Sequence, residues 1–447
     1  MHLEIPSVLG LPVDFLLFAG LLLGVAVFHH HTLRVAVLGL VAITVYKLFF
    51  SPFHGIAGAP GLAALLGHEW VLVANLFALL LGFALLSSHF EASRVPLVLP
   101  RFLPDDWKGG FVLLVLVFVL SSFLDNIAAA MIGGTMASAL FKGRLHVGFL
   151  AAIVAASNAG GSGSVVGDTT TTMMWIAGVR PAQVVEAYVA AVPALLFFGV
   201  VAARQQHALQ PITNDAPTGV TVDWPRLGIV ATILLTAVVA NVFVNLRHPE
   251  WSDRLAVLGL AVWLAIAVTA VMARPDWSVL PAATRGSVFL LALVLAASMM
   301  PVEVLPAASW PTALAIGFVS AVFDNIPLTA LALKQGGYDW GFLAYAVGFG
   351  GSMLWFGSSA GVALASMFPE ARSAKAWLVG GWHVAVAYVI GFAVLLAVLG
   401  WHPDPVVGGA AAPVGSVPTL KSACAAAGPH GTAPTIPACA GQAAMRY

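Results

Sequence analysis

An acidic residue interrupts a long apolar stretch at two places in this chain, and each time it opens the same motif, Asp-Asn-Ile. The first copy starts at Asp125 and the second at Asp324, about two hundred residues later. A charged side chain inside an apolar segment costs about 2.5–3.5 kcal/mol on membrane-insertion scales. Two copies of a costly motif in matching surroundings predict a site built from two related parts.

The composition is that of a membrane protein. Of 447 residues, 60% are hydrophobic and 9% are charged, and the mean hydropathy is +0.97, whereas soluble domains carry about 25% charged residues. The apolar segments are long enough to cross a lipid bilayer as helices. We therefore expect an all-α, multi-pass protein of the inner membrane. A net charge of zero argues against nucleic acid as a partner.

The ends of the chain lead to two smaller expectations. No basic stretch precedes the first apolar run, so we expect no cleaved signal peptide. The tail, residues 402–447, is rich in Ala, Pro and Gly and is predicted to be disordered. Its Cys424 and Cys439 are either bonded in an oxidising compartment or free thiols. The membrane part has no cysteine for a metal or redox site.

The apolar segments follow the same order in two halves. Each half has three plain spans, a segment with Asp-Asn-Ile, a segment interrupted by glycines, and a last plain span. The glycine interruptions match in spacing, since Gly160-Gly161-Ser162 precedes Gly167 just as Gly350-Gly351-Ser352 precedes Gly357. We predict two transmembrane repeats, residues 1–202 and 226–401, joined by a cytoplasmic linker, residues 203–225.

The Asp-Asn-Ile segments are predicted to be re-entrant helical hairpins, residues 110–140 and 310–334. The interrupted segments, 147–178 and 342–368, are predicted to be broken helices. Each repeat then crosses the membrane five times, and an odd number inverts the second repeat relative to the first. If the hairpins crossed fully, the two halves would instead be parallel.

Charge favours the inverted arrangement with both termini extracytoplasmic, because more Lys and Arg then lie on the cytoplasmic side. The cytoplasmic set is Arg34, Arg94, Arg101, Lys108, Lys142, Arg144, Arg204, Arg226, Arg274, Arg285, Arg372 and Lys375. The outer set is Lys47, Arg180, Arg247, Arg254 and Lys334.

The candidate site starts from Asp125 and Asp324. Burial disfavours the charged form of a carboxylate, so such a group can exchange a proton for a cation near neutral pH. The structural alternative is that each caps a helix. Asn126 and Asn325 offer amide oxygens to a cation such as Na⁺, or else tie the hairpin tips. Asp168 adds a third acid in the first half only, as a coupling group or as a helix cap.

The glycine-rich interruptions are predicted to unwind, which would expose backbone carbonyls to an ion or substrate. Close packing of small residues is the alternative. The residues in these two segments are Asn158, Gly160, Gly161, Ser162, Gly167 and Thr169 in the first half, and Gly350, Gly351, Ser352, Gly357, Ser358 and Ser359 in the second.

The order of hairpin, broken helix and span, twice over, resembles the ion transporter superfamily, which includes citrate carriers and divalent-anion/sodium symporters. The run from Asn158 to Asp168 looks like the superfamily's Asn-x-Gly-Gly-Thr-x-Thr-x-x-Gly signature. The closest likeness is to NhaD-type sodium/proton antiporters, on Leu124-Asp-Asn, Gly167-Asp-Thr-Thr-Thr-Thr-Met-Met-Trp175, Phe323-Asp-Asn-Ile-Pro-Leu328 and the segment from Gly350 to Val362.

The resemblance implies a scaffold part, a moving transport part and a homodimer. It implies a transporter rather than an enzyme, with Na⁺ and H⁺ as transported or coupling ions and no cofactor. In the dicarboxylate symporters the hairpin tips read Ser-Asn-Thr, whereas an acid stands first here. A fixed negative charge attracts cations and repels dicarboxylates. We therefore predict sodium/proton antiport, with cation-coupled transport of citrate or another organic anion as the alternative.

Overall fold

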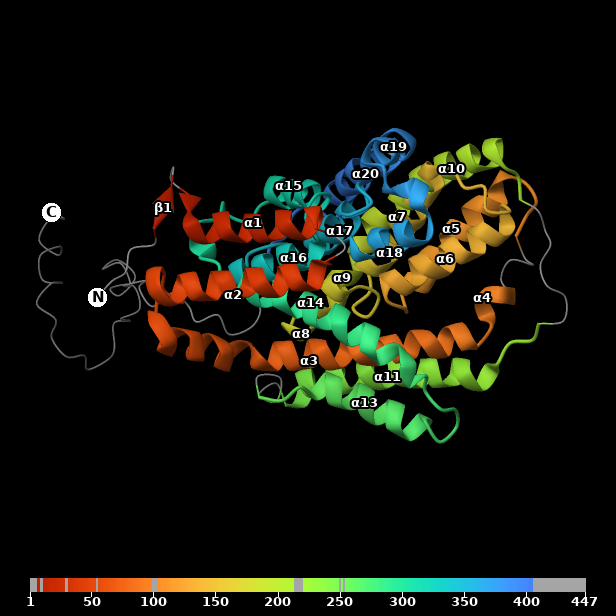
Figure 1. The fold of residues 1–447 in the computed structure, drawn as a ribbon. Coiled ribbons are helices and arrows are strands. Elements are labelled where there is room, and N and C mark those ends of the chain that lie inside the picture. The colour runs from red at the N-terminus through yellow and green to blue at the C-terminus, as the bar shows by residue number, and fades with distance from the viewer. Residues whose placement is uncertain are drawn as a thin grey trace, which may run out of the picture. The chain divides into compact units, whose positions relative to one another are not determined.

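The computed structural model describes residues 6–8, 11–28, 31–53, 55–98, 103–212, 220–248, 251 and 254–404. This part of the chain is mostly helical (Figure 1), with one short antiparallel pair, β1 (Ser7–Val8) and β2 (Leu11–Pro12). Cys424 and Cys439 lie outside the described residues, and so does nearly all of the predicted tail.

The helices follow one order twice. The first half contains α1 (Val13–Val27), α2 (Thr32–Phe50), α3 (Gly58–Ala92), α4 (Val95–Val98), α5 (Trp107–Ser121), α6 (Asn126–Leu140), α7 (Val147–Ser162), α8 (Thr169–Ile176), α9 (Pro181–Val185) and α10 (Ala187–Leu209). The second half contains α11 (Trp224–Arg247), α13 (Val257–Thr269), α14 (Leu280–Ser298), α15 (Trp310–Ser320), α16 (Asn325–Gln335), α17 (Trp340–Gly350), α18 (Ser359–Met367), α19 (Ala374–Gly380) and α20 (Trp382–Val398).

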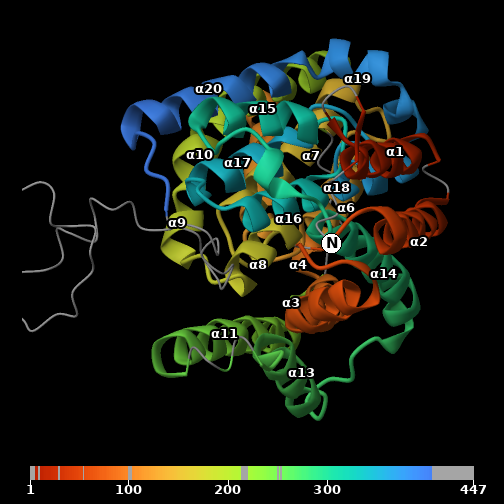
Figure 2. The same ribbon diagram turned by 90° about the vertical axis from the view of Figure 1, so that its left-hand side faces the viewer.

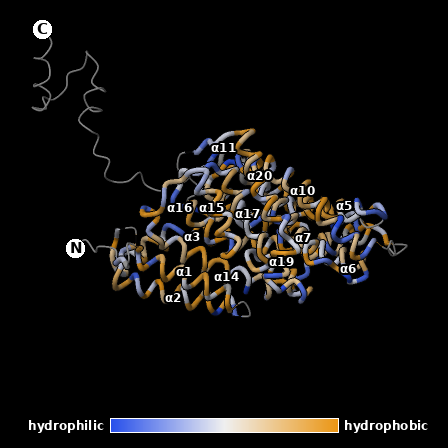
Figure 3. Tube along the Cα trace, turned by 90° about the horizontal axis from the view of Figure 1, so that it is seen from above, coloured by the Kyte–Doolittle hydropathy of each residue, from blue (hydrophilic) through white to orange (hydrophobic). Residues whose placement is uncertain are grey.

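Several helices can cross a membrane. By length and composition, four do so in the described residues, and α19 with α20 would make a fifth. Hydrophobic residues run along the lengths of α1, α2 and α14 (Figure 3). With several such helices, the chain is a multi-pass membrane protein.

Most predicted segments match helices, and four differ. The third plain span, which the apolar pattern predicts over residues 70–88, is the 35-residue helix α3. Helix α10 continues to Leu209, so the start of the predicted linker is helical. The apolar pattern predicts a span over about residues 255–273, whereas helix α13 ends at Thr269. The last span is not plain, because α19 and α20 meet at 59°.

The bend between α19 and α20 follows from close packing. A Cβ added at Gly381 would lie 2.8 Å from the Cβ of Ala151 in α7, and one at Gly380 would lie 3.1 Å from the backbone nitrogen of Gly148. The chain therefore passes over α7 at a distance that only glycine allows.

Most helices of the two hairpins and the two broken segments pack around one another, and α3 connects them to α11 and α13. Helices α5, α7, α10, α17 and α20 pack together, and α6, α8, α16 and α18 join them. Helix α3 lies between the pair α11–α13 and the rest (Figure 2), and it contacts α8, α11 and α13. Equivalent helices make equivalent contacts: α2 packs on α14 as α13 packs on α3, and α8 packs on α16 as α18 packs on α6.

A buried ion pair joins the first two helices. Lys47 Nζ in α2 lies 2.8 Å from Asp14 Oδ1 in α1, and both side chains are shielded from solvent. Ser51 Oγ donates to the other carboxylate oxygen at 3.2 Å. Lys334 at the end of α16 donates to the carbonyls of Ser298 and Met300. Both lysines are therefore held by contacts within the protein.

Candidate functional site

Four half-helices begin close together, and a side chain caps each. Asp125 caps α6 and Asp324 caps α16, each through the backbone N–H two residues on, at 2.8 and 3.0 Å. Asp168 caps α8 at 3.2 Å, and Ser358 caps α18 at 3.2 Å. Each helix N-terminus carries a partial positive charge that favours an anion. The capping role predicted as an alternative for the three acids is confirmed.

The first hairpin tip enters a neutral network. Asn126 Nδ2 donates to Asn158 Oδ1 at 3.1 Å. Asn158 Nδ2 in turn donates to Ser352 Oγ at 2.9 Å and to Ser358 Oγ at 3.1 Å. All four side chains are buried. The network links the first hairpin, the first broken helix and the second broken helix.

The second hairpin tip enters a charged network. Asn325 Nδ2 donates to Asp168 Oδ2 at 3.5 Å, and Asp168 is 2% exposed. Ser359 Oγ donates to Asp324 Oδ2 at 3.2 Å. Asp125 lines the same small cavity as Asp168, and Asp324 directly precedes Asn325, which donates to Asp168. The side chains of Asp125 and Asp324 are half-buried.

One pair of residues distinguishes the two networks. The position in α17 that matches Asn158 is Gly348. A Cβ added there would lie 3.0 Å from Ser162 Cβ and 3.5 Å from Asp168 Oδ2. The carboxylate of Asp168 therefore occupies the space where a second asparagine would reach. At these two matching positions the first half has Asn158 and Asp168, and the second half has Gly348 and Ser358.

The predicted unwound segments are shorter than expected. Asn158, Gly160, Gly161 and Ser162 remain helical in α7, and Gly350 remains helical in α17. The breaks cover residues 163–168 and 351–358, and Thr169 and Ser359 begin the helices that follow.

The glycines serve close packing, the alternative named above. A Cβ at Gly160 would lie 2.0 Å from Phe118 O in α5, and one at Gly350 would lie 2.3 Å from Gly317 O in α15. Gly167 and Gly357 approach the carbonyls of Ser121 and Ala321 in the same way. Each hairpin is thereby seated on the broken helix of its own half in a similar way, although Gly357 meets a carbonyl one position closer to the acid than Gly167 does.

The threonine run after Asp168 donates hydrogen bonds to backbone carbonyls of the first break. Thr171 Oγ1 donates to Ser164 O at 2.6 Å, and Thr172 Oγ1 donates to Val165 O at 2.9 Å. Both hydroxyls also donate to Asp168 O. In a bilayer, unpaired carbonyls are costly, so these bonds explain why this break carries a polar run.

Sequence reasoning missed one contributor to the first tip, Tyr188, and Ser164 joins it there. Tyr188 OH donates to Ser122 Oγ at 2.8 Å and to Gly160 O at 3.1 Å. Ser164 Oγ donates to Ser122 O at 2.6 Å. The signal available was Ser122 itself, a second hydroxyl beside the motif that the other tip replaces with Ala321.

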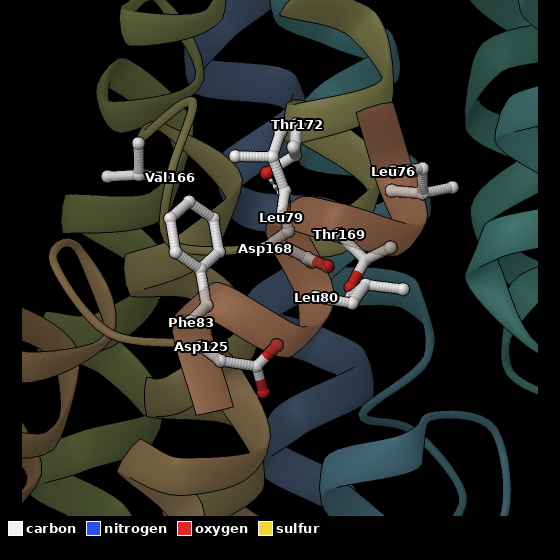
Figure 4. Close-up of a pocket in the computed structure, with 9 residues that line it drawn as sticks. All are labelled: Leu76, Leu79, Leu80, Phe83, Asp125, Val166, Asp168, Thr169 and Thr172. Carbon is white, nitrogen blue, oxygen red and sulfur yellow. Dashed lines mark hydrogen bonds between the residues drawn. The ribbon is translucent and has the colours of Figure 1, made fainter. Parts of the chain in front are cut away.

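A small cavity opens beside two of the acids (Figure 4). Its volume is about 10 Å³, close to the minimum for one water molecule. Asp125, Asp168, Thr169 and Thr172 line one side, and the figure shows Asp168 and Thr169 between the other two. The remaining lining residues are apolar: Leu76, Leu79, Leu80, Phe83 and Val166.

The three acids do not form a compact metal centre. Within the described residues, no three His, Cys, Asp or Glu side chains cluster closely enough to hold a metal ion. The oxygen atoms lie instead in two neighbouring networks that share the crossing of α7 and α17. Carboxylate, amide and hydroxyl oxygens are hard ligands of the kind that alkali cations accept.

Two plant proteins are similar to this chain. Sodium/proton antiporter 1 of Arabidopsis thaliana is 31% identical over 302 residues, which cover 58% of this chain and 50% of the antiporter. The chain is similar to sodium/proton antiporters. Sodium/proton antiporter 2 of the same plant is 28% identical over 311 residues, covering 58% of this chain and 69% of that protein. No family model matches the chain.

The similarity supports a relationship to cation/proton antiporters. The chain spans half the length of the first relative, so the activity of the whole plant protein does not transfer with the alignment. The resemblance to the wider superfamily of citrate carriers and symporters stays a prediction.

Proposed function

We propose that the protein exchanges Na⁺ for protons across a membrane, with the carboxylates at the half-helix N-termini as the exchanging groups. The observation that carries this proposal is the meeting of four half-helix starts, three of them capped by an acid: Asp125, Asp168 and Asp324. Each acid can hold a proton or lend its charge to a cation, but the two forms exclude each other. Because a proton and Na⁺ cannot occupy the same acid together, the flux of one is coupled to the opposite flux of the other.

Asp168 is the central group in this proposal. It is the most buried of the three acids, it shares a cavity with Asp125, and Asn325, next to Asp324, donates to it from the opposite half. Asn126, Asn325, Ser358 and Ser359 supply neutral oxygens or hold the acids in place. Within the described residues, no Lys or Arg pairs with any of the three acids, so a cation is the natural counter-charge.

The architecture in this proposal is an inverted repeat. Helices α5–α6 and α15–α16 are the re-entrant hairpins, and α7–α8 and α17–α18 are the broken helices of secondary transporters. The reciprocal contacts of α2 with α14 and of α13 with α3 support an approximate two-fold relation. We further propose the inner membrane as its location, extracytoplasmic termini and a homodimer.

The test uses purified protein in liposomes with a pH-sensitive dye and an acidified interior. We expect pulses of NaCl or LiCl to drive protons out, and KCl to do so far less. Sodium citrate should drive no more proton efflux than NaCl at the same Na⁺ concentration. A signal that requires citrate, followed by uptake of citrate itself, would replace antiport with organic-anion symport.

A further inference from the structure

The cavity beside Asp125 and Asp168 has an apolar wall formed by a single helix. Leu76, Leu79, Leu80 and Phe83 of α3 line it, and their spacing of three, four and seven residues places them on one face of the helix. Leu76 and Leu79 are fully buried. The oxygen-bearing side chains of the cavity come from other elements: Thr169 and Thr172 from α8, Asp168 from the break before α8, and Asp125 from the tip before α6.

The other side of α3 is fastened to α13. Asn75 Oδ1 accepts from Gly259 N at 3.0 Å, and Trp263 Nε1 donates to Ala78 O at 2.9 Å. Gly82 and Gly259 bring the two helices close, since an added Cβ on either would lie 2.5 Å from an atom of the partner helix. By contrast, no hydrogen bond joins α3 to α8 in the part of the chain that the structure describes. Helix α3 is therefore fixed to α13 by hydrogen bonds and close packing, and it contacts α8 through apolar side chains alone.

This arrangement limits what can enter. The space is close to that of one water molecule, so a cation must leave most of its hydration shell behind. The oxygens of Asp125, Asp168, Thr169 and Thr172 can replace part of that shell, whereas the leucines and Phe83 can replace none. The position of the wall then decides how large an ion the oxygens can surround.

We propose that this face of α3 determines the cation selectivity of the site, by excluding hydration water and holding the space to a small alkali ion. This inference rests on the proposed cation exchange. It assigns ion specificity to apolar residues that neither carry charge nor bind the exchanged proton. Leu80 is the first residue to change.

The test compares Leu80→Ala with the wild type in the liposome assay, using NaCl, LiCl, KCl and RbCl. Removing the side chain should enlarge the cavity and admit larger ions, so the ratio of KM for K⁺ to KM for Na⁺ should fall by about tenfold or more. Leu80→Met, which nearly conserves volume, should keep the wild-type ratio. Leu66→Ala, a residue of the same helix that is 45% exposed, should leave the ratio unchanged.

Phe83→Leu serves as a second enlargement, in case Leu80→Ala does not purify as a folded protein. An unchanged ratio in the folded enlargement variants would overturn the selectivity role of α3. An equal shift in Leu66→Ala would overturn it as well. Failure of antiport itself would appear differently, as a wild-type protein that moves no protons in response to any of the four salts.

Discussion

Asn158 in the first half donates its amide to Ser358 Oγ in the second half at 3.1 Å, and Ser358 stands where the first half has Asp168. The two halves therefore meet at the site through residues that occupy matching places but differ in chemistry. One network is neutral and the other is charged. A duplicated fold can thus carry a site in which the central acid occurs once.

Removing the charge of the central acid should stop exchange. We expect Asp168→Asn to abolish Na⁺-driven proton efflux in liposomes, because the amide can neither carry a proton nor balance a cation. Asp125→Asn and Asp324→Asn should reduce it strongly. Asp276→Asn, in an exposed loop, is the matched control and should behave as the wild type. Near-normal exchange by all three site variants would refute the model.

Competition between proton and cation should make the affinity depend on pH. When protons occupy the carboxylates, Na⁺ must displace them, so the apparent KM for Na⁺ should rise as pH falls, by up to about tenfold per unit for one competing proton. The maximal rate at saturating Na⁺ should change less. Initial rates over a Na⁺ series at several pH values measure both. A KM that stays flat from pH 6 to 9 would contradict direct competition.

Gly348 leaves little room for a side chain. Its Cβ would lie 3.0 Å from Ser162 Cβ, a close contact, and 3.5 Å from Asp168 Oδ2, so Gly348→Ala should shift α17 against Ser162, disturb the position of Asp168 and cut transport by about tenfold or more. Gly228→Ala is the control, because nothing lies within 4 Å of its added Cβ. Equal activity in the two variants would show that Asp168 does not need its present position.

The ion pair between Asp14 and Lys47 should matter for stability and not for chemistry. Lys47→Met leaves a buried carboxylate unpaired and should destabilise the fold by about 3–5 kcal/mol. The double variant with Asp14→Leu removes both charges and should recover much of that loss. Unfolding followed in detergent measures both. A double variant no more stable than Lys47→Met would show that packing, and not charge, is at stake.

The orientation of the two hairpins can be tested by labelling. With Cys424 and Cys439 changed to serine, single cysteines can replace Lys108, before the first hairpin, and Ala307, before the second, since both residues are exposed. In an inverted repeat they should react with a membrane-impermeant reagent from opposite sides of the membrane. Labelling from one side would favour parallel halves.

The sequence by itself determined the membrane class, the order of the helices and the two hairpin tips. Apolar length, the duplicated Asp-Asn-Ile and the matching glycines are local patterns, and they need no tertiary contact to be recognised. The tips lie where they were expected, between Ser121 and Asn126 and between Ser320 and Asn325. The length of the glycine breaks was less well predicted, because a glycine packed against a neighbouring backbone can stay helical.

Only the tertiary structure decided which polar groups meet. Asn158 reaches Ser358 and Asn325 reaches Asp168 because α7 and α17 cross and bring distant segments into contact. The bond between Lys47 and Asp14 and the wall from Leu76 to Phe83 depend in the same way on how α1, α2, α3 and α8 pack. Spacing along the chain carries no record of these contacts, since each joins residues whose separation is set by packing and not by helical period.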